Sequence, residues 1–378
     1  MTVTLGNEVL FERRRDLVAG KRVGLITNPS GITTDLRSTA DLLHEAEDVR
    51  LVALFGPEHG IRGNVADGAA VSSSVDEATG VPMYSLYGPV KKPTEEMLRG
   101  LDVVLFDIQD VGVRFYTYIY TMAYAMEACG DAGIPFVVLD RPNPLGGNAV
   151  EGNLLDMRFR SFVGNYPIPL RYGMTVGELA RLLNEEHALG ADLTVVPLVG
   201  WTRDMLFDDT GLPWVPPSPN MPSFATAIVY PGTCLFEGTS ISEGRGTTSP
   251  FQQIGAPYLD GPRLVDILDE RRLPGVLFRP LFFTPRFSKY EGELCGGVYV
   301  HVLDADVFEP VRAGLEMVAA LRTLYPDDFE WRPHFDLLAG TDAVRLAVEE
   351  GVFVDEILEG WAAEREVFEG IRGKYMVY

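Results

Sequence analysis

Hydrophobic residues in the first 200 positions of this chain follow two alternating patterns. Short apolar runs rich in branched residues predict strands, and stretches with apolar residues at helical spacing predict the helices between them. The predicted strands are residues 22–27, 50–55, 102–107, 134–140 and 193–198, and the predicted helices are 35–47, 118–132 and 176–187. This alternation favours an α/β fold, a Rossmann-like and mostly parallel sheet with helices on both faces.

A proline-rich segment separates this region from the rest of the chain. Residues 212–222 contain five prolines, a composition that is unsuited to a helix or a central strand. The pattern then predicts strands at 225–230, 276–283 and 297–303, helices at 262–271, 307–324 and 341–368, and a glycine-rich polar segment at 231–246. We therefore predict a Rossmann-like catalytic domain of residues 1–226 and a smaller C-terminal α+β domain of residues 227–378 that closes a cleft.

Polar loops follow four of the predicted strands, at residues 27–31, 56–63, 107–114 and 140–147. The carboxyl ends of parallel strands meet at one edge of a sheet, where ligands bind in open α/β folds. In the second loop, Glu58, His59 and Arg62 stand among glycines that let a backbone approach a substrate closely. The sequence thus predicts a binding or catalytic site at this edge.

No cofactor motif accompanies these loops. The first strand-to-helix turn, TNPSG at 27–31, lacks the glycine pattern of a dinucleotide site, and neither a P-loop nor a G-x-S-x-G elbow occurs. The histidines are scattered, although Glu58, Asp107, Asp110 and Asp140 could converge on a divalent cation. We predict no cofactor and no metal, and a metal-dependent hydrolase acting on another acidic substrate stays an alternative.

The charge of the chain limits its partners. A net charge of −22 opposes binding to nucleic acid or to an anionic membrane. No apolar run is long enough to insert into a membrane and no signal peptide is visible, so we expect a cytoplasmic protein, or a secreted or periplasmic one if a leader has been removed. Three scattered cysteines predict reduced thiols. The sequence makes no prediction of oligomeric state.

Carboxylates in the polar segments are candidates for acid–base chemistry. Glycoside hydrolysis uses two carboxyl groups, or one carboxyl group and the acetamido group of the substrate. Burial near Phe55 could keep Glu58 protonated. The other candidates are Asp107, Asp110, Glu237 and Glu243, and the aromatic residues Phe115, Tyr116, Tyr118 and Tyr120 could stack on a sugar, with a core position favoured for Tyr120.

Four arginines also fall in the polar loops: Arg62, Arg114, Arg141 and Arg245. Several guanidinium groups at one site would suit a substrate that bears a carboxylate. The alternative is that each arginine pairs with a neighbouring Asp or Glu, which is the usual fate of a single arginine.

These segments together resemble the NamZ-type (YbbC-like) exo-β-N-acetylmuramidases. The matching motifs are TNPSG at 27–31, GPEHGIRG at 56–63, DIQDVGVRFYTY at 107–118, DRPNP at 140–144, PSPNMP at 217–222 and YPGTCLFEG at 230–238. The resemblance implies a Rossmann-like domain, a smaller C-terminal domain and a site between them. It also implies release of terminal N-acetylmuramic acid from the non-reducing ends of peptidoglycan fragments, with Glu58 as the catalytic acid.

We therefore expect a glycosidase acting on muramyl saccharides derived from peptidoglycan. In this interpretation His59 and Asp110 tune or orient Glu58, and Glu237 or Glu243 activates water or supports attack by the acetamido oxygen. The predicted substrate-binding residues are Asn28, Arg62, Arg114, Tyr116, Asp140, Arg141, Asn143, Asn220 and Arg245, with the arginines holding the lactyl carboxylate. A non-catalytic binding protein for an acidic amino sugar or muropeptide is the alternative.

Overall fold

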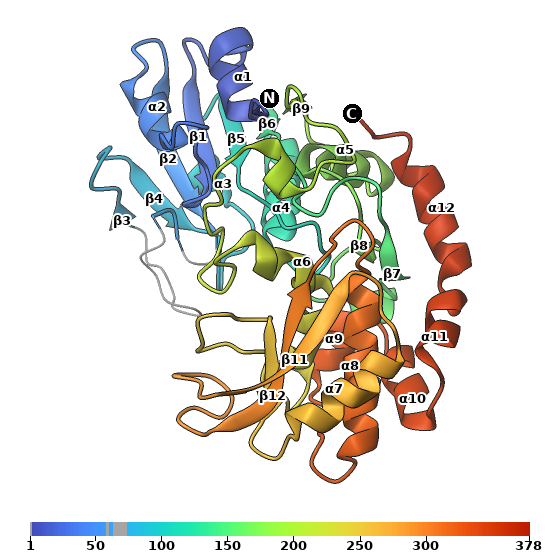
Figure 1. Ribbon diagram of the computed structural model, residues 1–378. Coiled ribbons are helices and arrows are strands. Elements are labelled where there is room, and N and C mark those ends of the chain that lie inside the picture. The colour runs from blue at the N-terminus through green and yellow to red at the C-terminus, as the bar shows by residue number, and fades with distance from the viewer. Residues whose placement is uncertain (1, 58–59, 63–73) are drawn as a thin grey trace.

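A seven-stranded sheet forms the centre of the N-terminal half of the computed structural model, which describes residues 2–57, 60–62 and 74–378 (Figure 1). The strand order is β3-β4-β2-β1-β5-β6-β9, and every pair is parallel except β3 with β4. The strands are β1 (Arg22–Thr27), β2 (Arg50–Gly56), β3 (Ser74–Val75), β4 (Pro82–Ser85), β5 (Val103–Asp107), β6 (Phe136–Leu139) and β9 (Leu193–Val196). All five strands predicted for this half are confirmed.

Helices cover both faces of this sheet. Helices α1 (Gly6–Arg13) and α2 (Thr39–Glu45) share one apolar cluster with Leu25, Leu54 and Leu105. Residues of α4 (Tyr118–Ala132) and α5 (Val176–Glu186) belong to a second cluster with Phe106 and Val138, which point to the opposite face. The predicted Rossmann-like architecture is confirmed.

The capping residues of α5 explain where this helix begins. The Thr175 hydroxyl accepts a hydrogen bond from the Glu178 amide at 3.2 Å, and the Thr175 amide donates to the Glu178 carboxylate at 3.0 Å. This capping box satisfies two backbone groups that a helix end otherwise leaves unpaired. The short helices of this half are α3 (Glu95–Leu98), η1 (Arg15–Leu17), η2 (Met157–Phe159) and η3 (Phe207–Thr210), and a small hairpin consists of β7 (Glu151–Leu154) and β8 (Pro169–Arg171).

The proline-rich segment crosses the carboxyl edge of the sheet near β1 and β5. The Pro217 carbonyl accepts hydrogen bonds from Asn28 Nδ2 at 3.0 Å and from the Tyr118 hydroxyl at 2.7 Å. Trp214 and its neighbours leave a cavity of only about 20 Å³ against Gln109 and other loop residues. In doubly wound folds this switch point is where a nucleotide binds. Here the chain's own crossing segment fills that position.

The strand predicted at residues 225–230 is wrong, because this segment is the helix α6 (Phe224–Thr233), followed by η4 (Cys234–Gly238). The Ser223 hydroxyl caps α6 by accepting a hydrogen bond from the Thr226 amide. Residues 226–233 are all buried. Gly232 lets α6 approach α8 (Pro310–Leu324) so closely that a Cβ atom there would lie 1.9 Å from the Pro310 carbonyl oxygen. A short apolar run without polar positions does not distinguish a buried strand from a buried helix.

The C-terminal part contains a three-stranded antiparallel sheet of order β10-β12-β11 with helices beside it (Figure 1). Its elements are β10 (Gln253–Ala256), β11 (Val276–Phe283), β12 (Cys295–Val302), α7 (Gly261–Glu270), α8 and α9 (His334–Ala339). The smaller α+β domain is therefore confirmed. Apolar residues of both parts belong to one buried cluster, which includes Phe106 and Val298.

The helix predicted at residues 341–368 is three helices, α10 (Ala343–Glu350), α11 (Val354–Gly360) and α12 (Ala362–Arg372). Gly351 ends α10 in the left-handed conformation, with φ of 74°. The last helix returns to the Rossmann-like domain (Figure 1), where Arg372 donates to the Gly147 and Gly173 carbonyls at 3.1 and 2.8 Å. The C-terminal helix thus connects the C-terminal domain to the Rossmann-like domain through hydrogen bonds.

Within the described ranges, no helix is long and apolar enough to cross a membrane. Cys129, Cys234 and Cys295 are buried and not joined in disulfides. Burial raises the pKa of the Cys129 thiol to about 12, so this side chain packs as a small apolar group.

Candidate functional site

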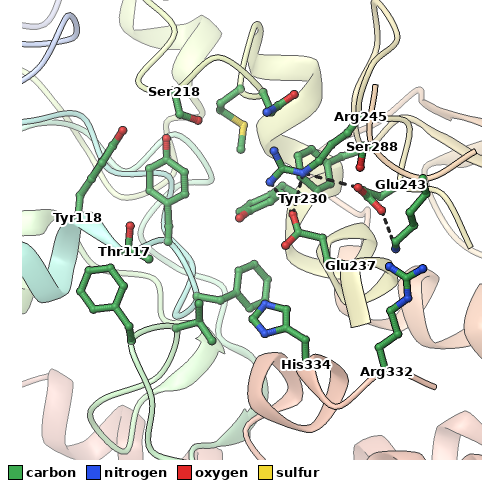
Figure 2. A pocket seen from close by; sticks show the side chains of 18 of the residues that line it. Thr117, Tyr118, Ser218, Tyr230, Glu237, Glu243, Arg245, Ser288, Arg332 and His334 are labelled. Carbon is green, nitrogen blue, oxygen red and sulfur yellow. Dashed lines mark hydrogen bonds and ion pairs between the residues drawn. The ribbon is translucent and has the colours of Figure 1, made fainter. Parts of the chain in front are cut away.

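A cavity of about 770 Å³ lies between the loop that follows β5 and the C-terminal domain (Figure 2). One wall comes from Phe115, Tyr116, Thr117 and Tyr118, at the carboxyl edge of the sheet. The opposite wall comes from the C-terminal domain and carries the acidic and basic groups, which are Glu237, Glu243, Arg245, Lys289, Arg332 and His334. The size and the mixture of aromatic and charged groups are typical of a small-molecule site.

Arg245 connects the two carboxylates of the cavity (Figure 2). Its Nη2 donates to Glu237 Oε1 at 2.6 Å, and its Nε lies 3.2 Å from Glu237 Oε1 and 3.6 Å from Glu243 Oε1. Gly244 and Gly246, with φ of 79° and 83°, form the turn that presents this arginine. Burial opposes the charge of Arg245, but Glu237 and Glu243 outweigh it, and the pKa of the guanidinium lies above its usual value.

Lys289 holds the second carboxylate. Its Nζ donates to Glu243 Oε2 at 2.9 Å and to the Phe236 and Ile241 carbonyls at 2.6 and 2.9 Å. Burial lowers the pKa of this ammonium below its usual value. The flanking Ser288 and Tyr290 have φ of 74° and 58°, a costly conformation for residues with a side chain. This backbone strain therefore occurs in the segment that places the Lys289 ammonium at the cavity.

The two carboxylates differ in accessibility. The Glu237 side chain is 21% exposed, whereas that of Glu243 is 2% exposed. Glu243 accepts contacts from both Lys289 and Arg245, so its oxygens are already engaged within the protein. Glu237 is therefore the better placed of the two to meet a substrate, and Glu243 is suited to holding the cations in position.

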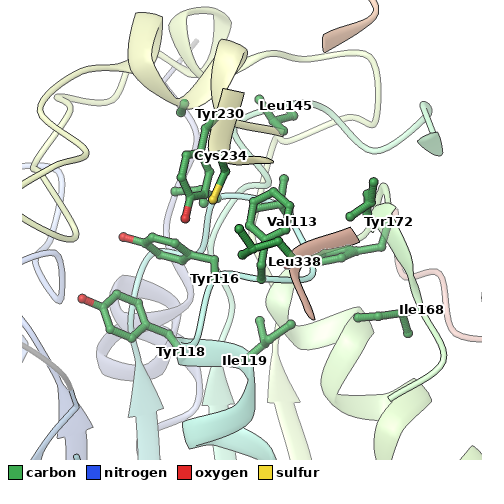
Figure 3. Packing of buried hydrophobic residues seen from close by; sticks show 14 of the residues in the cluster. Val113, Tyr116, Tyr118, Ile119, Leu145, Ile168, Tyr172, Tyr230, Cys234 and Leu338 are labelled. Carbon is green, nitrogen blue, oxygen red and sulfur yellow. The ribbon is translucent and has the colours of Figure 1, made fainter. Parts of the chain in front are cut away.

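Aromatic rings from both parts of the chain pack together along the cavity (Figure 3). Tyr116 packs edge-on against Tyr118, with ring centroids 4.9 Å apart, and against Tyr230 at 6.0 Å. Tyr230 packs in the same way against Phe251 at 4.7 Å. Figure 3 shows the hydroxyl groups of Tyr116, Tyr118 and Tyr230 pointing to one side of this cluster. The rings of Tyr116, Tyr118 and Tyr230 line the cavity, and aromatic ring surface of this kind suits the apolar face of a sugar.

Tyr120 does not line the cavity but lies in the core, the position that was predicted for it from the sequence. It is fully buried, and its hydroxyl donates to the Arg114 carbonyl.

Arg114 does not reach the cavity, contrary to its predicted contact with substrate. It is fully buried, and its guanidinium donates to the carbonyls of Asn153, Ile168, Leu338 and Ala339 at 2.6–3.2 Å. Burial lowers its pKa to about 10. The guanidinium thus donates hydrogen bonds to backbone carbonyls from both parts of the chain and stabilises the contact between them.

Arg141 and Asp140 are also engaged inside the protein rather than in the cavity. Arg141 Nε donates to Asp107 Oδ1 at 2.6 Å, and Nη2 donates to the Ile32 carbonyl at 2.8 Å. Asp140 accepts from the Gly177 amide and from the hydroxyls of Thr175 and Tyr378 at 2.7–2.8 Å. Burial raises the pKa of Asp140 to about 6.

Two asparagines predicted to bind substrate stabilise loops instead. Asn28 Oδ1 accepts from the Ser30 amide at 2.9 Å while its amide group holds the crossing segment at Pro217. Asn143 Nδ2 donates to the Met174 carbonyl at 2.9 Å, and Oδ1 accepts from the Leu145 amide at 2.9 Å. Both side chains are buried.

Arg62 and Asp110 likewise lie outside the lining of the cavity. Arg62 Nη2 contacts Asp41 at 2.8 Å and Asp76 at 2.9 Å, as the pairing alternative expected. Asp110 is buried, and its Oδ2 accepts from the Tyr172 hydroxyl and from the Gly112 amide. Its Oδ1 has no hydrogen-bond partner among the described residues, and burial raises its pKa to about 6.

Of the predicted site residues, the structure brings together Tyr116, Asn220, Glu237, Glu243 and Arg245 around one cavity. Glu58 and His59 lie outside the described residues, so their predicted catalytic roles stay predictions. No cluster of three or more possible metal ligands occurs in the described part of the chain.

Three basic residues of the cavity were not predicted from the sequence, namely Lys289, Arg332 and His334. Two signals pointed to them. Lys289 is one of only five lysines, and the segment WRPHF at 331–335 sets an arginine and a histidine among aromatic residues. Both signals were weak because neither segment follows a strand of the parallel sheet.

The chain matches two protein-family models along almost its whole length. Residues 23–225 match exo-β-N-acetylmuramidase NamZ, N-terminal, and residues 228–378 match exo-β-N-acetylmuramidase NamZ, C-terminal. A peptidoglycan β-N-acetylmuramidase NamZ of Bacillus subtilis is 54% identical over 378 residues, which are 100% of this chain and 91% of that protein.

Two crystal structures of DUF1343 family proteins from Bacteroides fragilis share the fold. The first is 40% identical with a TM-score of 0.93, and covers 100% of this chain and 99% of that chain. The second is 35% identical with a TM-score of 0.80, and also covers 100% of this chain and 99% of that chain.

Proposed function

Because the chain belongs to the NamZ family of exo-β-N-acetylmuramidases, we propose that it is an exo-acting glycosidase that releases terminal N-acetylmuramic acid from the non-reducing ends of peptidoglycan fragments. The family relationship confirms the resemblance seen in the sequence motifs. The observation that carries the proposal is the cavity, which is lined by residues from both matched segments and contains two carboxylates opposite an aromatic wall.

Glu237 is the described carboxylate that we assign to the reaction. It is accessible from the cavity and is held by Arg245 at 2.6 Å, so its orientation is fixed before substrate arrives. In this role it activates water, or steadies the positive charge of an acetamido group that attacks the anomeric carbon. Glu243 and Lys289 hold Arg245 and its surroundings in position.

Glu58 remains our candidate for the general acid, on the strength of its place in the GPEHGIRG motif at 56–63. A general acid protonates the leaving oxygen of the glycosidic bond, which departs as the alcohol of the next sugar. His59 would then orient or tune this carboxyl group. Asp110 is buried and outside the lining of the cavity, so we do not assign it a contact with substrate.

The test is turnover of a disaccharide that carries N-acetylmuramic acid at its non-reducing end. Mass spectrometry should detect both free sugars with the wild-type protein and no products with Glu58→Gln. An intact, tightly bound disaccharide without products would instead identify a binding protein. Loss of turnover on addition of EDTA would favour the metal-dependent alternative.

Folding must be checked for each variant by its thermal unfolding. If Glu58→Gln is folded and turns over a chromogenic N-acetylmuramide at the wild-type rate, the assignment of Glu58 is wrong.

A further inference from the structure

The cationic side chains that line the cavity differ in whether they form ion pairs with carboxylates of the protein. Within the described lining, the carboxylate of Glu237 pairs with Arg245, and the carboxylate of Glu243 pairs with Lys289 and Arg245. Arg332 is the third guanidinium or ammonium group of this lining. The described cavity therefore carries more cationic than anionic side chains, in a chain whose net charge is −22.

The backbone of Arg332 is firmly placed. Its amide donates to the Gly238 carbonyl at 2.8 Å, and its carbonyl accepts from the Phe335 amide at 2.9 Å. Gly238 makes this approach possible, because a Cβ atom there would lie 2.2 Å from Phe335 Cα. Arg332 is thereby fixed beside the helical turn that ends with Glu237 and Gly238.

The side chain of Arg332, in contrast, is exposed, and its guanidinium forms no hydrogen bond or ion pair with any residue in the part of the chain that the structure describes. Figure 2 shows it on the same side of the cavity as Glu243 and His334. After burial, which is the main cause, the charge of Arg332 is one of the influences that lower the pKa of Lys289. Since the Glu243 carboxylate already pairs with Lys289, Arg332 is the cation of the described lining that is available to an anion from outside the protein.

We propose that Arg332 binds the lactyl carboxylate of N-acetylmuramic acid and thereby selects this sugar over N-acetylglucosamine, which has a hydroxyl group at the same ring position. The assignment rests on the proposed function and adds a specificity-determining residue to it. A guanidinium binds a carboxylate with two parallel hydrogen bonds, a geometry that an ammonium group does not offer. Arg332 takes the role that the sequence had given to Arg62, Arg114, Arg141 or Arg245, all of which contact other groups of the protein.

The test compares two chromogenic substrates, a β-N-acetylmuramide and its analogue in which the lactyl carboxylate is a methylamide. Arg332→Leu should lower kcat/KM for the muramide roughly 10- to 100-fold, mainly by raising KM, since one charge-assisted contact is lost. It should leave the slower turnover of the methylamide within about twofold of wild type. Arg332→Lys should recover part of the loss.

The matched control is Arg263→Leu, which removes the same charge from an exposed position on α7. This variant should keep wild-type kinetics on both substrates. Equal losses for Arg332→Leu on the muramide and the methylamide would overturn the proposal, as would unchanged kinetics on both.

A binding measurement separates this proposal from the proposed function. If the wild-type protein turns over no muramide, the glycosidase assignment fails. Calorimetry with free N-acetylmuramic acid then still tests the carboxylate site. Binding that weakens about 10-fold or more in Arg332→Leu supports the site, and binding that is equal in both proteins or absent in the wild type refutes it.

Discussion

Two regions of this protein are rich in charged and polar residues, and they use them in opposite ways. In the strand-end loops of the Rossmann-like sheet, Asn28, Arg114, Asp140, Arg141 and Asn143 are buried and hydrogen-bonded within the protein. In the C-terminal domain, Glu237, Arg245 and Arg332 surround a cavity of about 770 Å³. Polar residues at the strand ends therefore stabilise the fold of this protein. The site differs from them in that its polar side chains are accessible from a cavity.

The crossing segment accounts for much of this difference. It covers the carboxyl edge near β1 and β5, so polar side chains there must find partners inside the protein or remain buried and unpaired. Among the described strand-end loops, the loop that follows β5 extends beyond this cover, and its residues Phe115 to Tyr118 reach the cavity, as does Tyr87 after β4. The candidate binding site therefore lies between the end of the sheet and the C-terminal domain.

The largest expected effect comes from the accessible carboxylate. Glu237→Gln should lower kcat roughly 10²- to 10⁴-fold, the usual contribution of an acid–base or charge-stabilising group, with little change in thermal stability. Steady-state kinetics on a chromogenic N-acetylmuramide measure this. Glu309→Gln is the matched control, because Glu309 also pairs with an arginine at 2.6 Å but lies outside the cavity. Wild-type kcat in a folded Glu237→Gln protein would refute the assigned role.

Arg114→Met should show the reverse behaviour. Removing the guanidinium leaves carbonyls of both parts of the chain without donors, and each unsatisfied buried group costs about 1–3 kcal/mol. We expect the free energy of unfolding in urea to fall by about 3 kcal/mol or more. Folded protein should keep its KM, since Arg114 is fully buried. A KM raised more than tenfold without loss of stability would mean that Arg114 meets the substrate after all.

The buried carboxyl group of Asp110 predicts a pH effect on stability. Burial raises its pKa from 3.8 to about 6, against the opposing hydrogen bonds from Tyr172 and Gly112. Folding therefore takes up a proton between these values, so the stability this carboxyl group provides is complete below about pH 4 and is lost as the pH rises through 6.

Urea unfolding of wild-type and Asp110→Asn proteins at pH 4 to 7 measures this effect. The difference between the two free energies of unfolding should shift by about 3 kcal/mol in favour of the variant as the pH rises. Because all other titrating groups are shared, their contributions largely cancel. A difference that is the same at every pH would contradict a raised pKa for Asp110.

Much of the framework could be predicted from the sequence, because local patterns determine it. The helix Tyr118–Ala132 and the strand Val276–Phe283 occur at the predicted residues. The strand predicted at 225–230 was wrong, because a run of apolar residues alone does not distinguish the repeat of a strand from that of a helix. The single helix predicted at 341–368 was wrong because helices end before Gly351 and at Gly360.

The site was harder to predict, because burial decides which polar residues are available. Glu237, Glu243 and Arg245 were found from a glycine-rich polar segment, and they do share the cavity. No local pattern indicates that the side chains of Arg114 and Arg141 are buried. Nor does any local pattern show that Gly238 brings Arg332 beside Glu237, since that contact joins segments distant in the chain.

The smallest expected effect tests how the end of the chain supports the strand-end loops. The Tyr378 hydroxyl donates to buried Asp140 at 2.7 Å, whereas the Tyr375 hydroxyl donates at 2.7 Å to Glu186, whose side chain is 31% exposed. Tyr378→Phe should lower the free energy of unfolding by about 1.5–3 kcal/mol, because a buried carboxylate loses a donor that water cannot replace. Tyr375→Phe should cost less than about 1 kcal/mol. Equal costs in urea unfolding would show that the strand-end loops do not depend on buried hydrogen bonds more than the surface does.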